Sequence, residues 1–357
     1  MAQRHRDTAF AQATDPRAEP PVTGCDGTAG DVLAGYLREQ ATTFLRALTQ
    51  GEGDGGSGGA PGTPDAAHQL RRSARRIGSA LHTYGPLTDT AWSEPLRAEL
   101  GWLASSLARE YQHSARLARL LSALHRLSSA EVEDEPALVP AQPGPPPPAP
   151  GGGPLAVGGA RAGALLERQL TLARTRAHSA ALQAMGSSRF HAVADAVAVL
   201  ASEVSLTAAA EAPADQTLTA LTERAHARLA EAAGALPLAR AGQPYNGDTL
   251  RAALAADLPA ERQDAPWHRV RILLRLSRYA REVFPYDDGE PETRPASLAR
   301  VLEQHREAAE AAEAVTAAAR TPRIAPATAY ALGVLHADQR QEVEQARFAF
   351  VHLWMRA

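Results

Sequence analysis

The sequence contains no lysine, so all 37 of its basic residues are arginine. Its single cysteine, Cys25, excludes an intramolecular disulfide and a zinc site built on cysteines. Aromatic residues make up only 5% of the chain, and hydrophobic residues reach 45% mainly through alanine and leucine. No stretch is apolar enough to span a membrane, and the first residues lack the apolar core of a signal peptide. These absences favour a soluble all-α protein, which we expect in the cytoplasm.

The charge balance limits the partners that the whole surface could bind. A net charge of -3 and a pI near 6.5 argue against a protein that coats nucleic acid with its entire surface. A coding bias is a sufficient explanation for the missing lysine. It nevertheless means that any anion site must use guanidinium groups, which grip phosphate oxygens in bidentate fashion and stay charged at physiological pH.

Segments rich in proline and glycine divide the chain. We expect a disordered leader (1–29), a first helical half (30–133), a Pro/Gly-rich linker (134–160) and a second helical half (161–357). Asp31 is the candidate N-cap of the first helix, and residues 51–62 read as a flexible loop. Apolar periodicity predicts helices over about 31–48, 64–84, 93–129, 161–184, 188–205, 214–234, 247–256, 261–284, 296–319 and 338–355.

One pattern occurs in both halves. His68, Arg71 and Arg75 follow the spacing H-x-x-R-x-x-x-R, and so do His268, Arg271 and Arg275. The two copies lie about 200 residues apart, which suggests an internal duplication of a helical unit.

Helical geometry places each copy on one face of its helix. At about 100° per residue, the basic positions of the first helix span an arc of about 140° and those of the second about 80°. No acidic residue occurs between Asp65 and Asp89 to compensate the first set. A solvated surface is the alternative, but two matching stripes favour a polyanion site. Its candidate residues are His68, Arg71, Arg72, Arg75, Arg76, His268, Arg271, Arg275 and Arg278.

No catalytic or cofactor motif is evident. The sequence lacks H-E-x-x-H and G-x-S-x-G, and a phosphate-binding loop ending in G-K-[ST] needs a lysine. The acidic run from Glu303 to Glu313 reads as an exposed helix face. We therefore expect no enzyme, no metal and no cofactor.

At these residues the sequence resembles the CHAD family, the conserved histidine α-helical domain. The segments that carry the resemblance are AAHQLRRSARRIGSALHTYG, WHRVRILLRLSRYAREVF and ALGVLHADQRQEVEQARFAFVHLWMR. Membership implies two similar antiparallel helical bundles related by a pseudo-twofold, with basic helices lining a shared groove. It also implies binding of inorganic polyphosphate and association with polyphosphate granules. The implied ligands are His68, Arg71, Arg75, Arg76, His268, Arg271, Arg275 and Arg278.

The chain departs from the family pattern at four basic positions, which are Gly78, Gly101, Tyr111 and Leu276. Arg72 offers partial compensation because an aliphatic residue is usual there. Two alternatives therefore stay open: a degenerate scaffold with weak or lost anion binding, and an accessory to an enzyme acting on phosphate chains. The E-x-E-x-K signature of the triphosphatase that often accompanies the family is absent.

Polyphosphate fits the predicted faces better than single-stranded nucleic acid, because it carries no bases and the faces offer few aromatic platforms. We expect affinity to fall steeply with salt and to rise as the histidines become charged at lower pH. Neither a membrane nor a protein partner is indicated.

Overall fold

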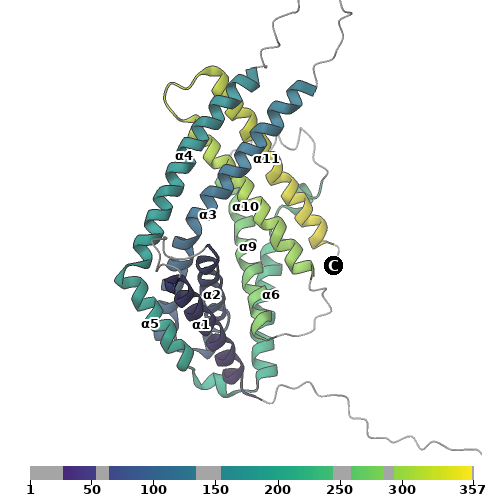
Figure 1. The fold of residues 1–357 in the computed structure, drawn as a ribbon. Coiled ribbons are helices and arrows are strands. Elements are labelled where there is room, and N and C mark those ends of the chain that lie inside the picture. The colour runs from purple at the N-terminus through teal and green to yellow at the C-terminus, as the bar shows by residue number, and fades with distance from the viewer. Residues whose placement is uncertain (1–26, 54–63, 134–153, 244–258, 285–292, 356–357) are drawn as a thin grey trace, which may run out of the picture.

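The computed structural model describes residues 27–53, 64–133, 154–243, 259–284 and 293–355, and within these ranges the chain forms helices and no strand (Figure 1). The leader up to residue 26, most of the glycine-rich loop, residues 134–153 and the helix expected at 247–256 lie outside the described residues. The all-α prediction is confirmed. The helices are α1 (Ala29–Gly53), α2 (Pro64–Thr83), α3 (Thr90–Glu133), α4 (Pro154–Met185), α5 (Ser188–Ser202), α6 (Ala214–Gly234), α7 (Leu238–Ala241), α9 (Ala260–Val283), α10 (Thr293–Ala319) and α11 (Pro326–Trp354), with short 3-10 turns η2 (Gly85–Leu87) and η3 (Ala208–Glu211).

The start of α1 corrects one expectation. Asp31 is not the N-cap: the Thr28 hydroxyl accepts a hydrogen bond from the Asp31 amide at 3.1 Å, and the Asp31 carboxylate accepts one from the Thr28 amide at 3.2 Å. This reciprocal pair is a capping box with Thr28 as the cap. Thr28 also forms a bridge with Pro213, and Ala29 is fully buried, so the last residues assigned to the leader belong to the fold.

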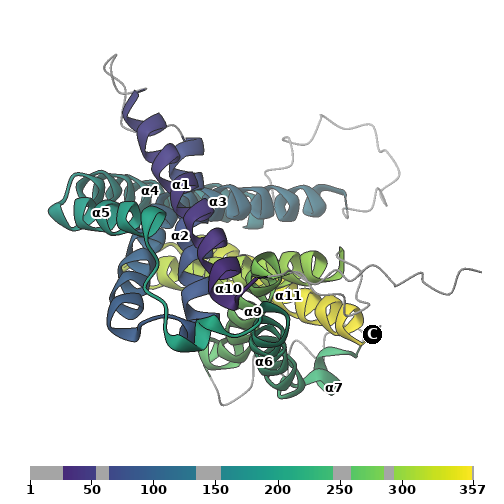
Figure 2. The same ribbon diagram turned by 90° about the horizontal axis from the view of Figure 1, so that it is seen from below.

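Two long helices give the molecule its shape. Helices α3 and α4 run antiparallel along one another (Figure 1), and seen from below they lie with α5 on one side while α6, α9, α10 and α11 gather on the other (Figure 2). Because α4 begins at Pro154, residues 154–160, which we had assigned to the linker, are helical. Gly158 permits this arrangement, since a Cβ there would lie 2.1 Å from the carbonyl oxygen of Ala327 in α11.

The apolar cores mix residues from both sides of the Pro/Gly segment. One cluster joins α1, α2 and the start of α3 to α5 and the start of α6. A second lies between the end of α3, α4, α10 and α11, and a third between α6, α7, α9, α10 and α11. The division into two halves and their pseudo-twofold relation stay predictions.

Tyr84, directly after α2, contacts both α6 and α9. Its side chain is fully buried at the end of α2, its hydroxyl donates to the Ala280 carbonyl of α9 at 2.9 Å, and it lies 2.8 Å from the Thr222 hydroxyl of α6. This contact helps to hold α2 against α9, the two helices that carry the basic motifs.

None of the described helices is long and apolar enough to cross a membrane.

Candidate functional site

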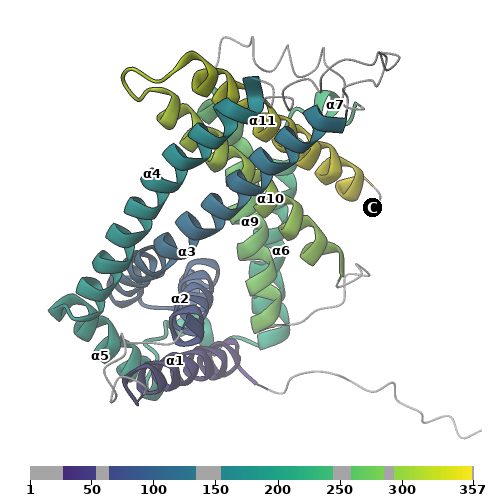
Figure 3. The same ribbon diagram turned by 45° about the horizontal axis from the view of Figure 1, so that its top comes forward.

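The two helices that carry the H-x-x-R-x-x-x-R motifs pack against one another. Figure 3 shows α2 lying between α3 and α9. The helical periodicity of apolar residues explains this placement. Leu70, Ala74 and Ile77 face the core, so the opposite, basic side of α2 faces α9 and solvent.

A row of guanidinium groups crosses from one helix to the other. Arg75 is half-buried, and burial together with the charges of Arg275 and Arg71 lowers its pKa to about 10. Burial likewise lowers the pKa of Arg271, with a further contribution from Arg275. We call Arg71, Arg75, Arg275 and Arg271 the arginine row. Its members repel one another, so the folded chain holds positive charge together at a cost in stability.

The first motif extends the row toward solvent. His68 is exposed, and its Nδ1 lies 3.3 Å from a terminal nitrogen of Arg71. The Arg71 guanidinium also lies 5.8 Å from the centre of the Tyr111 ring, which comes from α3. Arg72 is exposed and has no ion pair within the described part of the chain.

Arg76 has a different environment from its neighbours. Its Nε donates to the Glu282 carboxylate of α9 at 2.6 Å, and a second bond of 3.2 Å completes a bidentate pair. The Tyr36 hydroxyl of α1 approaches the same carboxylate, at 3.5 Å. Arg76 therefore ties α2 to α9 and is already neutralised.

The second motif is more buried than the first. The pKa of His268 is lowered, chiefly by burial, and its ring meets the edge of the His305 ring at 5.7 Å between centroids. Arg271 pairs with Glu303 of α10 at 3.3 Å. Arg275 and Arg278 are half-buried and form no ion pair with the residues described.

Glu303 is the carboxylate that faces the arginine row. It also accepts hydrogen bonds from Arg306 at 2.6 and 3.0 Å. Burial alone would raise the pKa of Glu303, but the hydrogen bonds from Arg306 and the charges of Arg306, Arg271 and Arg75 hold it below its ordinary value. The carboxylate therefore stays ionised and neutralises one end of the row.

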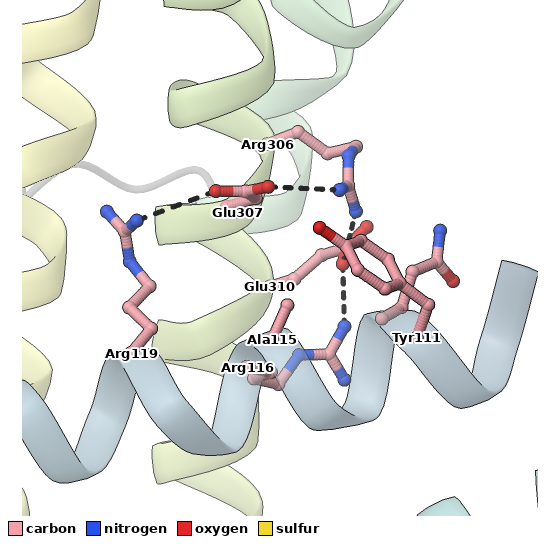
Figure 4. A pocket seen from close by; sticks show the side chains of 8 residues that line it. Tyr111, Ala115, Arg116, Arg119, Arg306, Glu307 and Glu310 are labelled. Atoms are coloured by element: carbon pink, nitrogen blue, oxygen red, sulfur yellow. Dashed lines mark hydrogen bonds and ion pairs between the residues drawn. The ribbon is translucent and has the colours of Figure 1, made fainter. Parts of the chain in front are cut away.

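A network of ion pairs continues from that end to α3. Arg306 and Arg116 both reach Glu310 at 2.6 Å, and Arg119 pairs with Glu307 at 3.7 Å (Figure 4). Arg119 also pairs with Glu342 of α11. The expectation of an exposed acidic face is therefore wrong for three residues, which are half-buried: Glu307 and Glu310 pair with arginines of α3, and Glu303 pairs with Arg271 of α9. The i,i+3 and i,i+4 spacing around Arg306 was visible in the sequence, but the partners on α3 lie almost 200 residues away and gave no signal.

A second charged cluster joins α9 to α11. Asp264 of α9 is only 2% exposed. It accepts hydrogen bonds from two arginines of α11, Arg340 at 2.6 Å and Arg347. Arg347 also donates to Nε2 of the buried His305 at 3.3 Å. Arg347 also pairs with Glu344 at 2.6 Å, so two carboxylates compensate the two arginines, and these contacts hold α9, α10 and α11 together. Among the described residues, no group of three or more His, Cys, Asp or Glu is placed to hold a metal ion.

Comparison with known proteins agrees with this architecture. The family model described as CHAD domain matches residues 57–286. Among solved structures, PptA from Streptomyces chartreusis is 52% identical, with a TM-score of 0.73 over 92% of this chain and 100% of that chain. The CHAD domain from the plant Ricinus communis is 20% identical, with a TM-score of 0.52 over 94% of this chain and 96% of that chain, and shares the fold. No protein of curated annotation matches the chain.

Proposed function

Because the chain belongs to the CHAD family, we propose that it binds inorganic polyphosphate through the arginine row and associates with polyphosphate granules. The observation that carries the proposal is the approach of α2 and α9, which holds Arg75 and Arg275 together without an ion pair to a described residue. Phosphate oxygens bound between these side chains would remove their repulsion. Guanidinium groups are suited to this role because each can donate two parallel hydrogen bonds to a phosphoryl group.

The predicted ligands divide into two groups on electrostatic grounds. Arg76 and Arg271 already have carboxylate partners, so they position the helices and contribute less free positive charge. The residues that we propose to contact phosphate directly are His68, Arg71, Arg72, Arg75, Arg275 and Arg278. His268 lies deeper, and we propose that it donates a hydrogen bond when protonated.

The decisive experiment is a titration of long-chain polyphosphate at low and high salt. Removing Arg75 and Arg275 together as alanines should weaken binding at least tenfold, or about 1.4 kcal/mol. By analogy with nucleic-acid backbones, the slope of the logarithm of affinity against the logarithm of salt concentration should become less negative by about 1–2. The matched control replaces Arg168 and Arg174, two exposed arginines of α4, with alanine and should leave affinity and salt dependence unchanged.

Glu303→Gln is a variant that should strengthen polyphosphate binding instead of weakening it. The substitution keeps the shape of the side chain and removes the negative charge that faces the row, so polyphosphate should bind more tightly. Failure of the wild-type chain to bind at low salt would support a degenerate scaffold instead. Release of phosphate from tripolyphosphate in the presence of Mg²⁺ would support an enzyme and contradict a purely binding role.

A further inference from the structure

A cavity of about 310 Å³ lies between α2, α3 and α4, beside the solvent end of the arginine row. Its volume falls at the lower end of the range for small-molecule sites, about 300–1,000 Å³. Its lining changes in character with depth. Charged and aromatic residues of α2 and α3 line one part of it, and apolar residues of α3 and α4 line the other.

The mouth of the cavity combines a cation with an exposed aromatic ring. Tyr111 is 66% exposed, although large aromatic side chains normally bury most of their surface. The Arg71 guanidinium lies 5.8 Å from the centre of its ring and beside His68. A flat ligand could stack on this ring while Arg71 and His68 hold a phosphate attached to it.

The wall and the floor are unsuited to inorganic phosphate. Glu110 pairs with Nδ1 of His178 at 2.9 Å on the wall, and its carboxylate would repel a phosphoryl group. The same oxygens can accept hydrogen bonds from hydroxyl or amino groups. The floor is apolar, with Leu107 and Ala181 buried and Leu182 half-buried. A chain of phosphates has no group that matches either surface.

We propose that this cavity binds the nucleoside part of a nucleoside triphosphate. The base stacks on Tyr111 and enters the apolar floor, and its amino group or a sugar hydroxyl donates to Glu110. The triphosphate then extends past Arg71 and His68 toward Arg75. Only this phosphate end is shared with the polyphosphate site proposed above, so the two proposals can fail independently.

Calorimetric titration of the full chain with ATP and with inorganic tripolyphosphate, in the absence of divalent cations, tests the proposal. ATP should bind about tenfold more tightly, because its base can stack on an aromatic side chain and inorganic tripolyphosphate has no base. Tyr111→Ala should abolish that preference by weakening ATP alone, and its folding is not at risk because the side chain is largely exposed. Tyr330→Ala, which removes another exposed tyrosine on α11, is the matched control and should change neither affinity.

Two further variants examine opposite ends of the cavity. Arg71→Ala should weaken ATP and tripolyphosphate alike, whereas Glu110→Gln should improve tripolyphosphate binding and narrow the preference for ATP. Equal affinity of the wild-type chain for the two ligands would overturn the proposal, and so would an equal effect of Tyr111→Ala on both. If ATP binds with this Tyr111 dependence while long-chain polyphosphate does not bind, the cavity site stands and only the polyphosphate function fails.

Discussion

Arg75 holds its positive charge without an ion pair to any described residue. Its guanidinium is half-buried and has two positive neighbours in Arg71 and Arg275. Burial and these charges lower its pKa to about 10, which means that the folded state disfavours its charged form. Such a side chain weakens the fold, which is the cost expected of a residue in the proposed anion site.

Replacing Arg75 with methionine should therefore stabilise the protein. Methionine keeps an unbranched apolar stem and removes the charge. We therefore expect urea denaturation to show that the free energy of unfolding rises by about 1–2 kcal/mol. Arg168→Met on the exposed face of α4 is the control and should change stability by less than about 0.5 kcal/mol. A loss of stability in the Arg75 variant would mean that its packing outweighs its repulsion.

The two basic stripes could be predicted from the sequence, but the contacts that their side chains make could not. Helical spacing identified the basic stripes because it depends only on neighbours along one helix. The partner of Arg76 is Glu282, which lies 206 residues away. Tyr111 reaches Arg71 only because α3 packs on α2. Both contacts depend on tertiary structure, which the spacing of residues within one helix does not contain.

At the scale of single helices, the start of α4 shows how packing can override composition. The segment around Gly158 and Gly159 reads as a linker because glycine weakens helices. It is nevertheless helical, since its buried residues Leu155 and Ala162 join the core shared with α10 and α11. By contrast, α6 was predicted with its observed bounds, because its apolar period is regular and no glycine interrupts it before its end.

The adjacent glycines Gly158 and Gly159 of this helix should respond in opposite ways to alanine. At Gly159 a Cβ meets nothing within 4 Å, so Gly159→Ala should stabilise the protein by about 0.5–1 kcal/mol through helix propensity. At Gly158 a Cβ would lie 2.1 Å from a backbone oxygen of α11, so Gly158→Ala should destabilise it by about 1–3 kcal/mol. Chemical denaturation of the two variants checks this. Similar effects at both positions would contradict the close approach of α4 and α11.

For the molecule as a whole, composition was enough to predict an all-α fold, whereas the grouping of helices into cores was not accessible. Alanine and leucine at helical spacing identify which face of each helix is buried, but many helix pairs could cover such faces. The structure joins α1 to α5 and α3 to α10 across the Pro/Gly segment. The net charge of -3 also hides a local excess of positive charge, because Arg71 and Arg75 on the α2 side of the row form no ion pair with a described residue.

Histidines in partly or fully buried positions link stability of the whole fold to pH. Burial is the main cause of the lowered pKa values of His113, His268, His305 and His336. The effect is greatest for His305, which is 1% exposed, accepts a hydrogen bond from Arg347 and lies near His268 and Arg340. In the folded protein these rings stay neutral at a pH where the unfolded chain binds protons.

The sign of the resulting pH dependence follows from this difference. Below the ordinary histidine pKa of 6.5 the unfolded chain binds more protons than the folded one, so stability should fall as pH drops toward the lowered values. Each fully shifted histidine contributes a slope of up to about 1.4 kcal/mol per pH unit. We expect urea denaturation between about pH 8 and pH 5 to show this loss. His305→Gln should flatten it, because glutamine can still accept the hydrogen bond from Arg347 but takes up no proton. His125→Gln removes an exposed histidine on α3 and should leave the slope unchanged. Equal slopes in the wild-type chain and the His305 variant would show that this ring titrates alike in both states.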